Sequence, residues 1–274
     1  MRCAHEAKAV LPDNVLVLMS DAHHVDWIMH PLAVAVTRGA TKALKEILAA
    51  GANTERLDSD GETALFVAAA AGREKETKML LDAGADVNAL SNITGFTPLF
   101  RASSGQDCMG TGVIKILLDS GAQLNATCCP GSANTGLTAL HYAAIGGCES
   151  SIRALVKAGL DPSVPTDLNR TPLHMAGAAK HADAVGVLLA LGADPNRVDY
   201  LGNTPLMDAT HRRCEACVSR LLPVSNLSIT NRDGHNAFTK CLAVKTTPPL
   251  PIDDPCATVF AKYSEKALCE NAAG

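Results

Sequence analysis

The chain has 274 residues, of which 47% are hydrophobic and 19% are charged, and its formal net charge is -4. This composition excludes a disordered tail and a strongly basic protein, so we expect no general binding to nucleic acid through phosphate contacts. The apolar stretch from Val10 to Met19 is interrupted by Pro12 and Asp13, and no stretch of about 18 uncharged apolar residues occurs. The sequence therefore predicts neither a membrane span nor a signal peptide.

Cysteine usage favours a reducing compartment. The ten cysteines are scattered through segments with helical patterns. A chain of this size does not need disulfides to hold its core together, so we expect free thiols rather than a disulfide framework. This predicts a cytoplasmic protein, with the nucleus as the alternative location.

Residues 1–29 precede a series of similar segments that fills most of the chain. The segments begin at His30-Pro31-Leu32, Thr63-Ala64-Leu65, Thr97-Pro98-Leu99, Thr138-Ala139-Leu140, Thr171-Pro172-Leu173 and Thr204-Pro205-Leu206. The intervals between their leucines are 33, 34, 41, 33 and 33 residues. A second landmark follows at a nearly fixed distance, in Gly51-Ala52-Asn53, Gly84-Ala85-Asp86, Gly121-Ala122-Gln123, Gly159-Leu160-Asp161 and Gly192-Ala193-Asp194. The chain is therefore an array of repeats.

These residues resemble the ankyrin repeat, with the fullest matches at Thr138-Ala139-Leu140-His141 and Thr171-Pro172-Leu173-His174. The resemblance implies an all-α fold, an ankyrin-repeat solenoid of about six to seven helix-turn-helix repeats with β-hairpin tips and modified terminal caps. We expect the ankyrin-repeat domain over residues 30–240. Residues 1–29 would be an N-terminal cap or degenerate repeat, and residues 241–274 a Pro-containing linker and a C-terminal capping helix.

Each landmark also has a local physical reason. A Thr hydroxyl can cap the first amides of a helix, and a following Pro fits the first helical position because its missing N–H is not needed there. The leucine pairs Leu80-Leu81, Leu117-Leu118 and Leu188-Leu189 predict the apolar stripe of a second helix, with Leu81 and Leu117 in the core. The Gly that follows can adopt the left-handed conformation that ends a helix.

The array departs from its pattern in the middle and at its end. The 41-residue interval reflects extra residues around 103–112 and 128–135. They are either tolerated surface insertions or a loop that touches a partner. Pro223-Val224-Ser225-Asn226 replaces the sixth Gly landmark, and a seventh unit begins near Asn231 and fades after Phe238.

Two groups of residues could indicate a catalytic or metal-binding site, and both also have a structural explanation. His211, Cys214 and Cys217 have a spacing that metal ligands or a redox pair could use, which would support a metal- or thiol-dependent enzyme. Cys217, however, falls at an apolar helix position, so we expect structural cysteines. His141 and His174 occupy equivalent positions, and the resemblance implies that they brace neighbouring loops by hydrogen bonding. We therefore expect no enzyme, no metal and no cofactor.

The resemblance implies a partner protein or peptide held on the concave face, where tips and first helices of successive repeats meet. Transferring the variable positions of that face selects Asp60, Glu62, Phe96, Leu137, Ile145, Arg170, Tyr200, Asn203, His211, Arg212, Arg232 and His235. Tyr and Arg are the expected anchors. We predict a protein-binding scaffold or adaptor, monomeric on its own. The alternative is a substrate-recognition or regulatory subunit of a larger complex, such as a ubiquitin-ligase receptor or an assembly chaperone.

Charge and modification give two further expectations. Residues 53–86 carry eight acidic and four basic residues, whereas residues 204–240 carry three acidic and five basic ones, so the binding face would run from acidic to basic. Ordinary solvated faces would explain the same distribution. The resemblance also implies that asparagine hydroxylation can occur at the position after the Gly landmark, which here is Asn88, Asn125 and Asn196.

Overall fold

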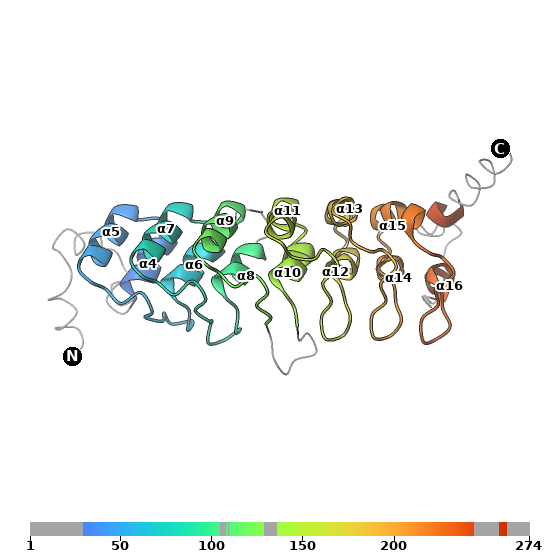
Figure 1. Cartoon of the computed structure of the whole chain (residues 1–274), viewed down its shortest axis with the longest axis horizontal. Coiled ribbons are helices and arrows are strands. Elements are labelled where there is room, and N and C mark those ends of the chain that lie inside the picture. The colour runs from blue at the N-terminus through green and yellow to red at the C-terminus, as the bar shows by residue number, and fades with distance from the viewer. Residues whose placement is uncertain (1–29, 105–107, 109, 129–135, 244–257, 262–274) are drawn as a thin grey trace. The chain divides into compact units, whose positions relative to one another are not determined.

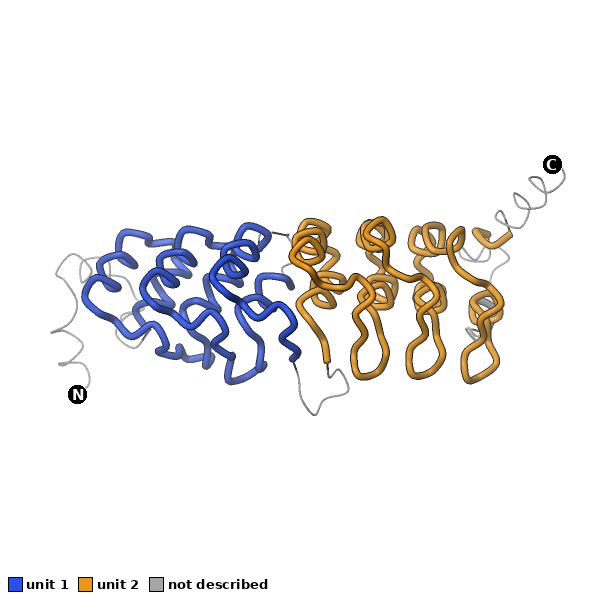
Figure 2. The backbone as a smooth tube through the Cα atoms, viewed as in Figure 1, with its two compact units in different colours: residues 1–129 blue, residues 130–274 orange. Residues whose placement is uncertain are grey.

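The computed structural model describes residues 30–104, 108, 110–128, 136–243 and 258–261. The chain divides into two compact units, residues 1–129 and 130–274, which we call unit 1 and unit 2 (Figure 2). The described residues form helices and loops without a β-strand, which confirms the all-α class but not the β-hairpin form of the tips. None of the described helices is long and apolar enough to cross a bilayer. The caps predicted in residues 1–29 and in most of 241–274 lie outside the described residues.

Unit 1 contains three described pairs of short antiparallel helices. The pairs are α4 (Pro31–Thr37) with α5 (Thr41–Ala49), α6 (Ala64–Ala70) with α7 (Glu74–Asp82), and α8 (Pro98–Ser103) with α9 (Thr111–Asp119). Within this unit the first helices of the pairs pack side by side, and so do the second helices (Figure 1). A single pair cannot bury its own apolar faces, so the core is made between pairs.

Unit 2 repeats this arrangement. Its pairs are α10 (Ala139–Gly146) with α11 (Glu149–Lys157), α12 (Pro172–Ala179) with α13 (Ala182–Ala190), and α14 (Pro205–His211) with α15 (Glu215–Leu221). A 3₁₀ turn, η1 (Leu222–Val224), follows where Pro223 replaces the Gly landmark, and α16 (Ala237–Ala243) packs beside α14. Residues 258–261 are helical, and the ring of Phe260 lies edge-on to that of Phe238 with centroids 5.7 Å apart.

The predicted helix starts are confirmed. The hydroxyls of Thr63, Thr97 and Thr204 each accept the amide three residues later, at 3.3 to 3.4 Å. Pro98 and Pro205 occupy the first helical positions of α8 and α14. Since these helices span only six to nine residues, a satisfied N-terminus matters for each of them.

Burial of the leucine pairs follows the helical period. Leu80 and Leu117 are fully buried, as is Leu188, whereas their neighbours toward the C-terminus are only half-buried. Leu81 was expected in the core and is half-buried instead, because the next position on a helix is rotated by about 100°. After α7 the chain turns at Gly84 with a φ of 89°, the left-handed conformation expected at that landmark.

Candidate functional site

Consecutive loop tips in unit 2 are tied together through their backbones. The Tyr200 amide donates to the Leu168 carbonyl at 3.0 Å, and the Arg232 amide donates to the Leu201 carbonyl at 2.9 Å. Tyr200 and Leu201 are 43% and 42% exposed, and Arg232 is exposed beside them. We call Tyr200, Leu201 and Arg232 the tip row. Their shared backbone bonds hold an aromatic, an aliphatic and a cationic side chain at the surface in one place.

A buried polar network supports the tip row. The side-chain nitrogen of Asn203 donates to the Asp199 carboxylate at 3.4 Å. Its side-chain oxygen accepts from the side chains of Asn231, at 3.0 Å, and Lys240. Asn203 is only 5% exposed, because its side chain joins the loops of successive repeats. It therefore offers little surface to a partner. It fixes the loops that carry Tyr200.

Arg170 lies on the first-helix side of unit 2 in a defined ion pair. Its guanidinium donates to the Asp208 carboxylate at 2.8 Å, and the two side chains are 26% and 15% exposed. Asp208 belongs to α14, one repeat further along the chain. The pair therefore joins neighbouring repeats and holds the charge of Arg170 in place.

His141 and His174 brace the repeats as expected. Each Nδ1 accepts the amide of the capping Thr at 3.1 Å, which leaves Nε2–H to donate to a carbonyl of the next repeat, Arg170 for His141 and Asn203 for His174. Both rings are fully buried. Burial lowers the pKa of His141 from its ordinary 6.5 to about 4 and also lowers the pKa of His174. The two side chains are therefore neutral near pH 7 and serve as fixed donors.

The remaining candidates in unit 2 divide by exposure. His211 and Arg212 are exposed at the end of α14, Ile145 is 38% exposed, and His235 is half-buried. Leu137 is only 2% exposed and offers almost no surface to a partner. A large aliphatic side chain just before a helix start is drawn into the core by the hydrophobic effect.

The three candidates in unit 1 form a separate group. Asp60 is exposed in the loop before α6, and Glu62 is half-buried next to it. Burial raises the pKa of Glu62, and the nearby Asp58 adds to the rise. Phe96 stacks on Phe100 with ring centroids 5.8 Å apart. These residues belong to a different compact unit from Tyr200 and Arg232.

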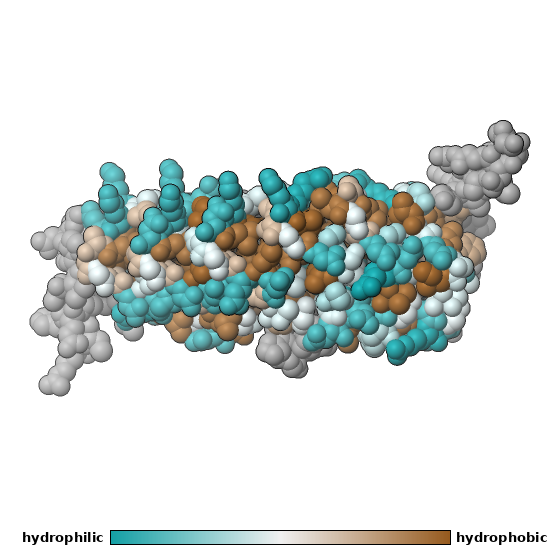
Figure 3. Space-filling view, viewed as in Figure 1, coloured by the Kyte–Doolittle hydropathy of each residue, from teal (hydrophilic) through white to brown (hydrophobic). Residues whose placement is uncertain are grey.

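Several exposed apolar residues were not predicted. Leu90 and Ile93 are 59% and 72% exposed near a loop tip of unit 1, and Val198 and Leu201 are each 42% exposed in unit 2. Apolar residues inside otherwise polar tips are the signal that could have identified them. Figure 3 shows hydrophobic residues in small patches among hydrophilic ones on the face that it views. Mixed surfaces of this kind are usual in non-obligate protein interfaces.

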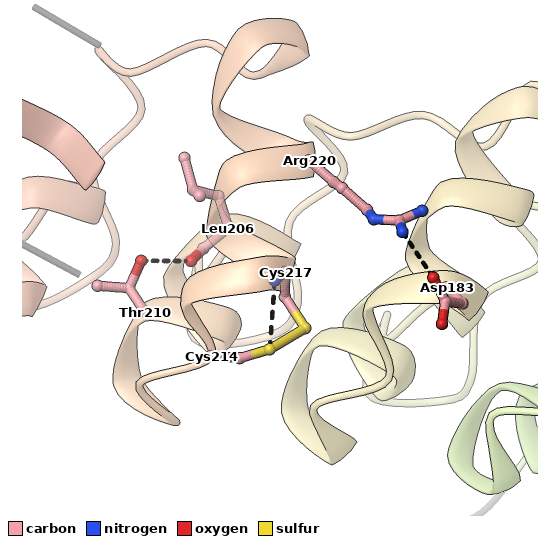
Figure 4. The surroundings of a disulfide bond; sticks show 6 residues. All are labelled: Asp183, Leu206, Thr210, Cys214, Cys217 and Arg220. Carbon is pink, nitrogen blue, oxygen red and sulfur yellow. Dashed lines mark hydrogen bonds and ion pairs between the residues drawn. A yellow bond between two sulfur atoms is a disulfide. The ribbon is translucent and has the colours of Figure 1, made fainter. Parts of the chain in front are cut away.

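Cys214 and Cys217 are joined by a disulfide (Figure 4), which overturns the expectation of free thiols for this pair. Cys214 caps α15, and Cys217 is fully buried on its first turn, which confirms the structural position expected for it. Because the two sulfurs bond to each other, neither is available as a thiolate ligand. In the described part of the chain, no group of three or more His, Cys, Asp and Glu residues is arranged to hold a metal ion.

Two of the asparagines after the Gly landmark join consecutive loops. The side-chain oxygen of Asn88 accepts the Gln123 amide at 2.9 Å, and that of Asn196 accepts the Asn226 amide at 2.7 Å. These bonds give both residues a role in stacking the repeats. Their hydroxylation stays a prediction.

Known proteins share this sequence pattern and this fold. A family model of three ankyrin repeats matches residues 32–128, 110–199 and 161–233. B-cell lymphoma 3 protein homolog of Mus musculus is 29% identical over 174 residues, which cover 61% of this chain and 37% of that protein. Protein PhlB of Serratia liquefaciens is 35% identical over 148 residues, which cover 53% of this chain and 60% of that protein. The chain thus spans less than two thirds of either relative.

A solved structure shows the same fold. The ankyrin repeat domain of human ASB11 aligns with a TM-score of 0.71 and 24% identity, covering 84% of this chain and 96% of that domain. At this identity the likeness concerns the fold alone. The family model, by contrast, matches most of the sequence from residue 32 to residue 233. The chain belongs to the ankyrin-repeat family.

Proposed function

We propose that this protein is a scaffold or adaptor that holds a partner protein or peptide on the tips and first helices of unit 2. Ankyrin repeats are protein-interaction modules. Their fold offers a series of similar loops and helix faces, so a partner can contact several repeats at once. Such a role does not require the protein to catalyse a reaction on its partner.

The tip row is the observation that carries this proposal. Tyr200 and Leu201 remain exposed although an aliphatic and an aromatic side chain gain free energy on burial. Arg232 lies beside them, and Tyr and Arg are the residue types that most often dominate protein interfaces. Because backbone hydrogen bonds and the Asn203 network already fix the loops, binding would cost little conformational entropy.

Affinity capture from a native lysate tests the proposal. The wild-type chain is compared with Tyr200→Ala plus Arg232→Ala, and with Arg153→Ala plus Lys157→Ala on the exposed side of α11 as the matched control. Circular dichroism checks that all three fold. We expect a protein that the wild type and the control recover equally, and that the tip variant recovers at least about tenfold less. Equal recovery by the tip variant would place binding elsewhere.

A further inference from the structure

The turn between the two helices of a pair needs a left-handed residue, and two repeats use a basic one. The residue at this turn is Gly39, Gly72 and Gly147 in three repeats, with φ of 65°, 62° and 72°. In the two repeats that follow α11 it is Lys180, with φ of 68°, and Arg213, with φ of 55°. A side chain with a Cβ is strained in this conformation, whereas Gly is not. Both repeats therefore retain a basic residue where Gly would fold more easily.

Other basic side chains gather at the same two turns. His181 follows Lys180, and His211 and Arg212 precede Arg213. We call these five residues the basic edge. The helices α12 and α14 that lead into the turns pack side by side, so the turns are neighbours. Lys180, His211 and Arg212 are exposed, and the sequence has no acidic residue over 175–182 or 209–214.

Two carboxylates near this edge are already paired with other residues. Asp208 is bound to Arg170 at 2.8 Å, and Asp183 is bound to Arg220 at 2.6 Å (Figure 4). Glu215, at the start of α15, is the acidic residue next in sequence to the second turn. Exposed Lys180 and Arg212 outnumber Glu215, so this edge carries net positive charge, and like charges held close together destabilise the fold.

Helix stability alone does not account for these residues. Positive charges do interact favourably with the C-terminal ends of α12 and α14. That interaction does not require a strained residue, however, because Arg212 already supplies a charge at the C-cap of α14 in an ordinary right-handed conformation. Residues held in such strained backbone conformations cluster at active sites and at sites that clamp a ligand.

We propose that the basic edge binds an acidic peptide segment, whose Asp or Glu carboxylates pair with Lys180, Arg212 and the residues beside them. This inference rests on the proposed binding function of unit 2 and specifies the chemistry of its partner. The tip row precedes α14 and the basic edge follows it, so at least the length of this seven-residue helix, about 10 Å, separates the two. An extended segment crosses that distance in about three to four residues. The partner would place an apolar residue at the tips and acidic residues at least about three to four positions away.

Fluorescence anisotropy with a labelled Glu-rich peptide tests this on the full chain, with a Gln-rich peptide of equal length for comparison. We expect the Glu-rich peptide alone to bind, and its affinity to fall with added salt. Lys180→Gly and Arg212→Gln should each weaken binding roughly three- to tenfold. Arg153→Gln, on the exposed side of α11, should leave it unchanged.

Lys180→Gly separates binding from folding. It removes the charge and relieves the backbone strain, so its thermal midpoint should equal or exceed that of the wild type. Three results would each overturn the inference. They are wild-type affinity for the Glu-rich peptide in both Lys180→Gly and Arg212→Gln, binding of the Gln-rich peptide as tight as that of the Glu-rich peptide, and binding of a single-stranded oligonucleotide tighter than that of the Glu-rich peptide. If the two edge variants bind the Glu-rich peptide as the wild type does, while the tip variant loses its partner in lysate capture, the acidic partner is refuted and the proposed function still stands.

Discussion

His141 and His174 join each repeat to the next through one ring. The ring accepts an amide of its own helix start on one nitrogen and donates to a carbonyl of the next loop on the other. This arrangement uses the neutral form, since a protonated ring would have two donors and no acceptor. A single side chain therefore satisfies buried backbone groups in two repeats.

For the same reason, the free energy of unfolding should decrease as the pH is lowered. Because burial holds the pKa of His141 at about 4, below its ordinary 6.5, the neutral ring adds stability above pH 6.5 that is lost as the pH falls toward 4. The loss approaches roughly 3 kcal/mol for His141, and the lowered pKa of His174 acts in the same direction. Urea unfolding at about pH 7.5 and about pH 5 should show roughly 2 kcal/mol of this loss, since pH 5 lies above the folded pKa.

The variant His141→Gln isolates this contribution. It should be less stable at neutral pH, because Gln cannot reproduce both the bond from the Thr138 amide and the bond to the Arg170 carbonyl, but it should depend less on pH than the wild type. His211→Gln, at an exposed histidine, is the matched control and should keep the full dependence. An unchanged pH dependence in His141→Gln would contradict the assignment.

Residue-scale expectations succeeded where the role was local. The capping role of Thr63 and Thr204 depends only on the residues that follow, and the structure confirms it. The exposure of Leu137 and Asn203 depends on what the rest of the fold places around them, and both are buried although they were predicted as partner contacts. Burial at a repeat boundary is a property of two repeats, so one repeat's pattern does not reveal it.

At the scale of elements, the helices are too short to be stable alone. Segments of six to nine residues are marginal in water, so packing against neighbours stabilises them. The first helices bury nearly one whole side, as Leu140, Ala143 and Ala144 in α10 illustrate. In α14 the buried hydroxyl of Thr210 donates back to the Leu206 carbonyl at 2.7 Å, which satisfies it inside the core (Figure 4).

The disulfide at the start of α15 gives a prediction for that helix. Alkylation of the denatured, unreduced protein should leave Cys214 and Cys217 unmodified in peptide mapping, and reduction should expose both. Replacing the pair by Cys214→Ser and Cys217→Ala should lower the free energy of unfolding by about 2 kcal/mol, because the closed loop is short. Labelling of both cysteines before reduction would contradict the bond.

At the scale of the whole molecule, stability is a sum of contributions from neighbouring repeats. Each described pair packs on the next pair of its own unit. In such an array the ends open most easily, since a terminal repeat has one neighbour instead of two. In unit 2, Phe260 lies against Phe238, which is still 47% exposed beyond the last full pair.

Loss of Phe260 should therefore destabilise one end selectively. Phe260→Ala should weaken the packing on Phe238 by roughly 3 kcal/mol and speed amide hydrogen exchange in α16, while exchange in α12 stays as in the wild type. Val224→Ala, at an exposed position of the same unit, is the control. Equal acceleration in α12 and α16 would show that unit 2 opens as one block instead.

The sequence by itself determined the repeat period, the helix starts, the left-handed turns and the family, because each is specified by residues within one repeat. The tertiary structure decided which residues remain at the surface, the bond between Cys214 and Cys217, and the division into two units at residues 129 and 130. That division falls within the longest interval between repeats, which the sequence marked only as an insertion. The physical reason is range: a helix cap is satisfied by its neighbours in the chain, whereas burial and the grouping of exposed side chains depend on packing between repeats.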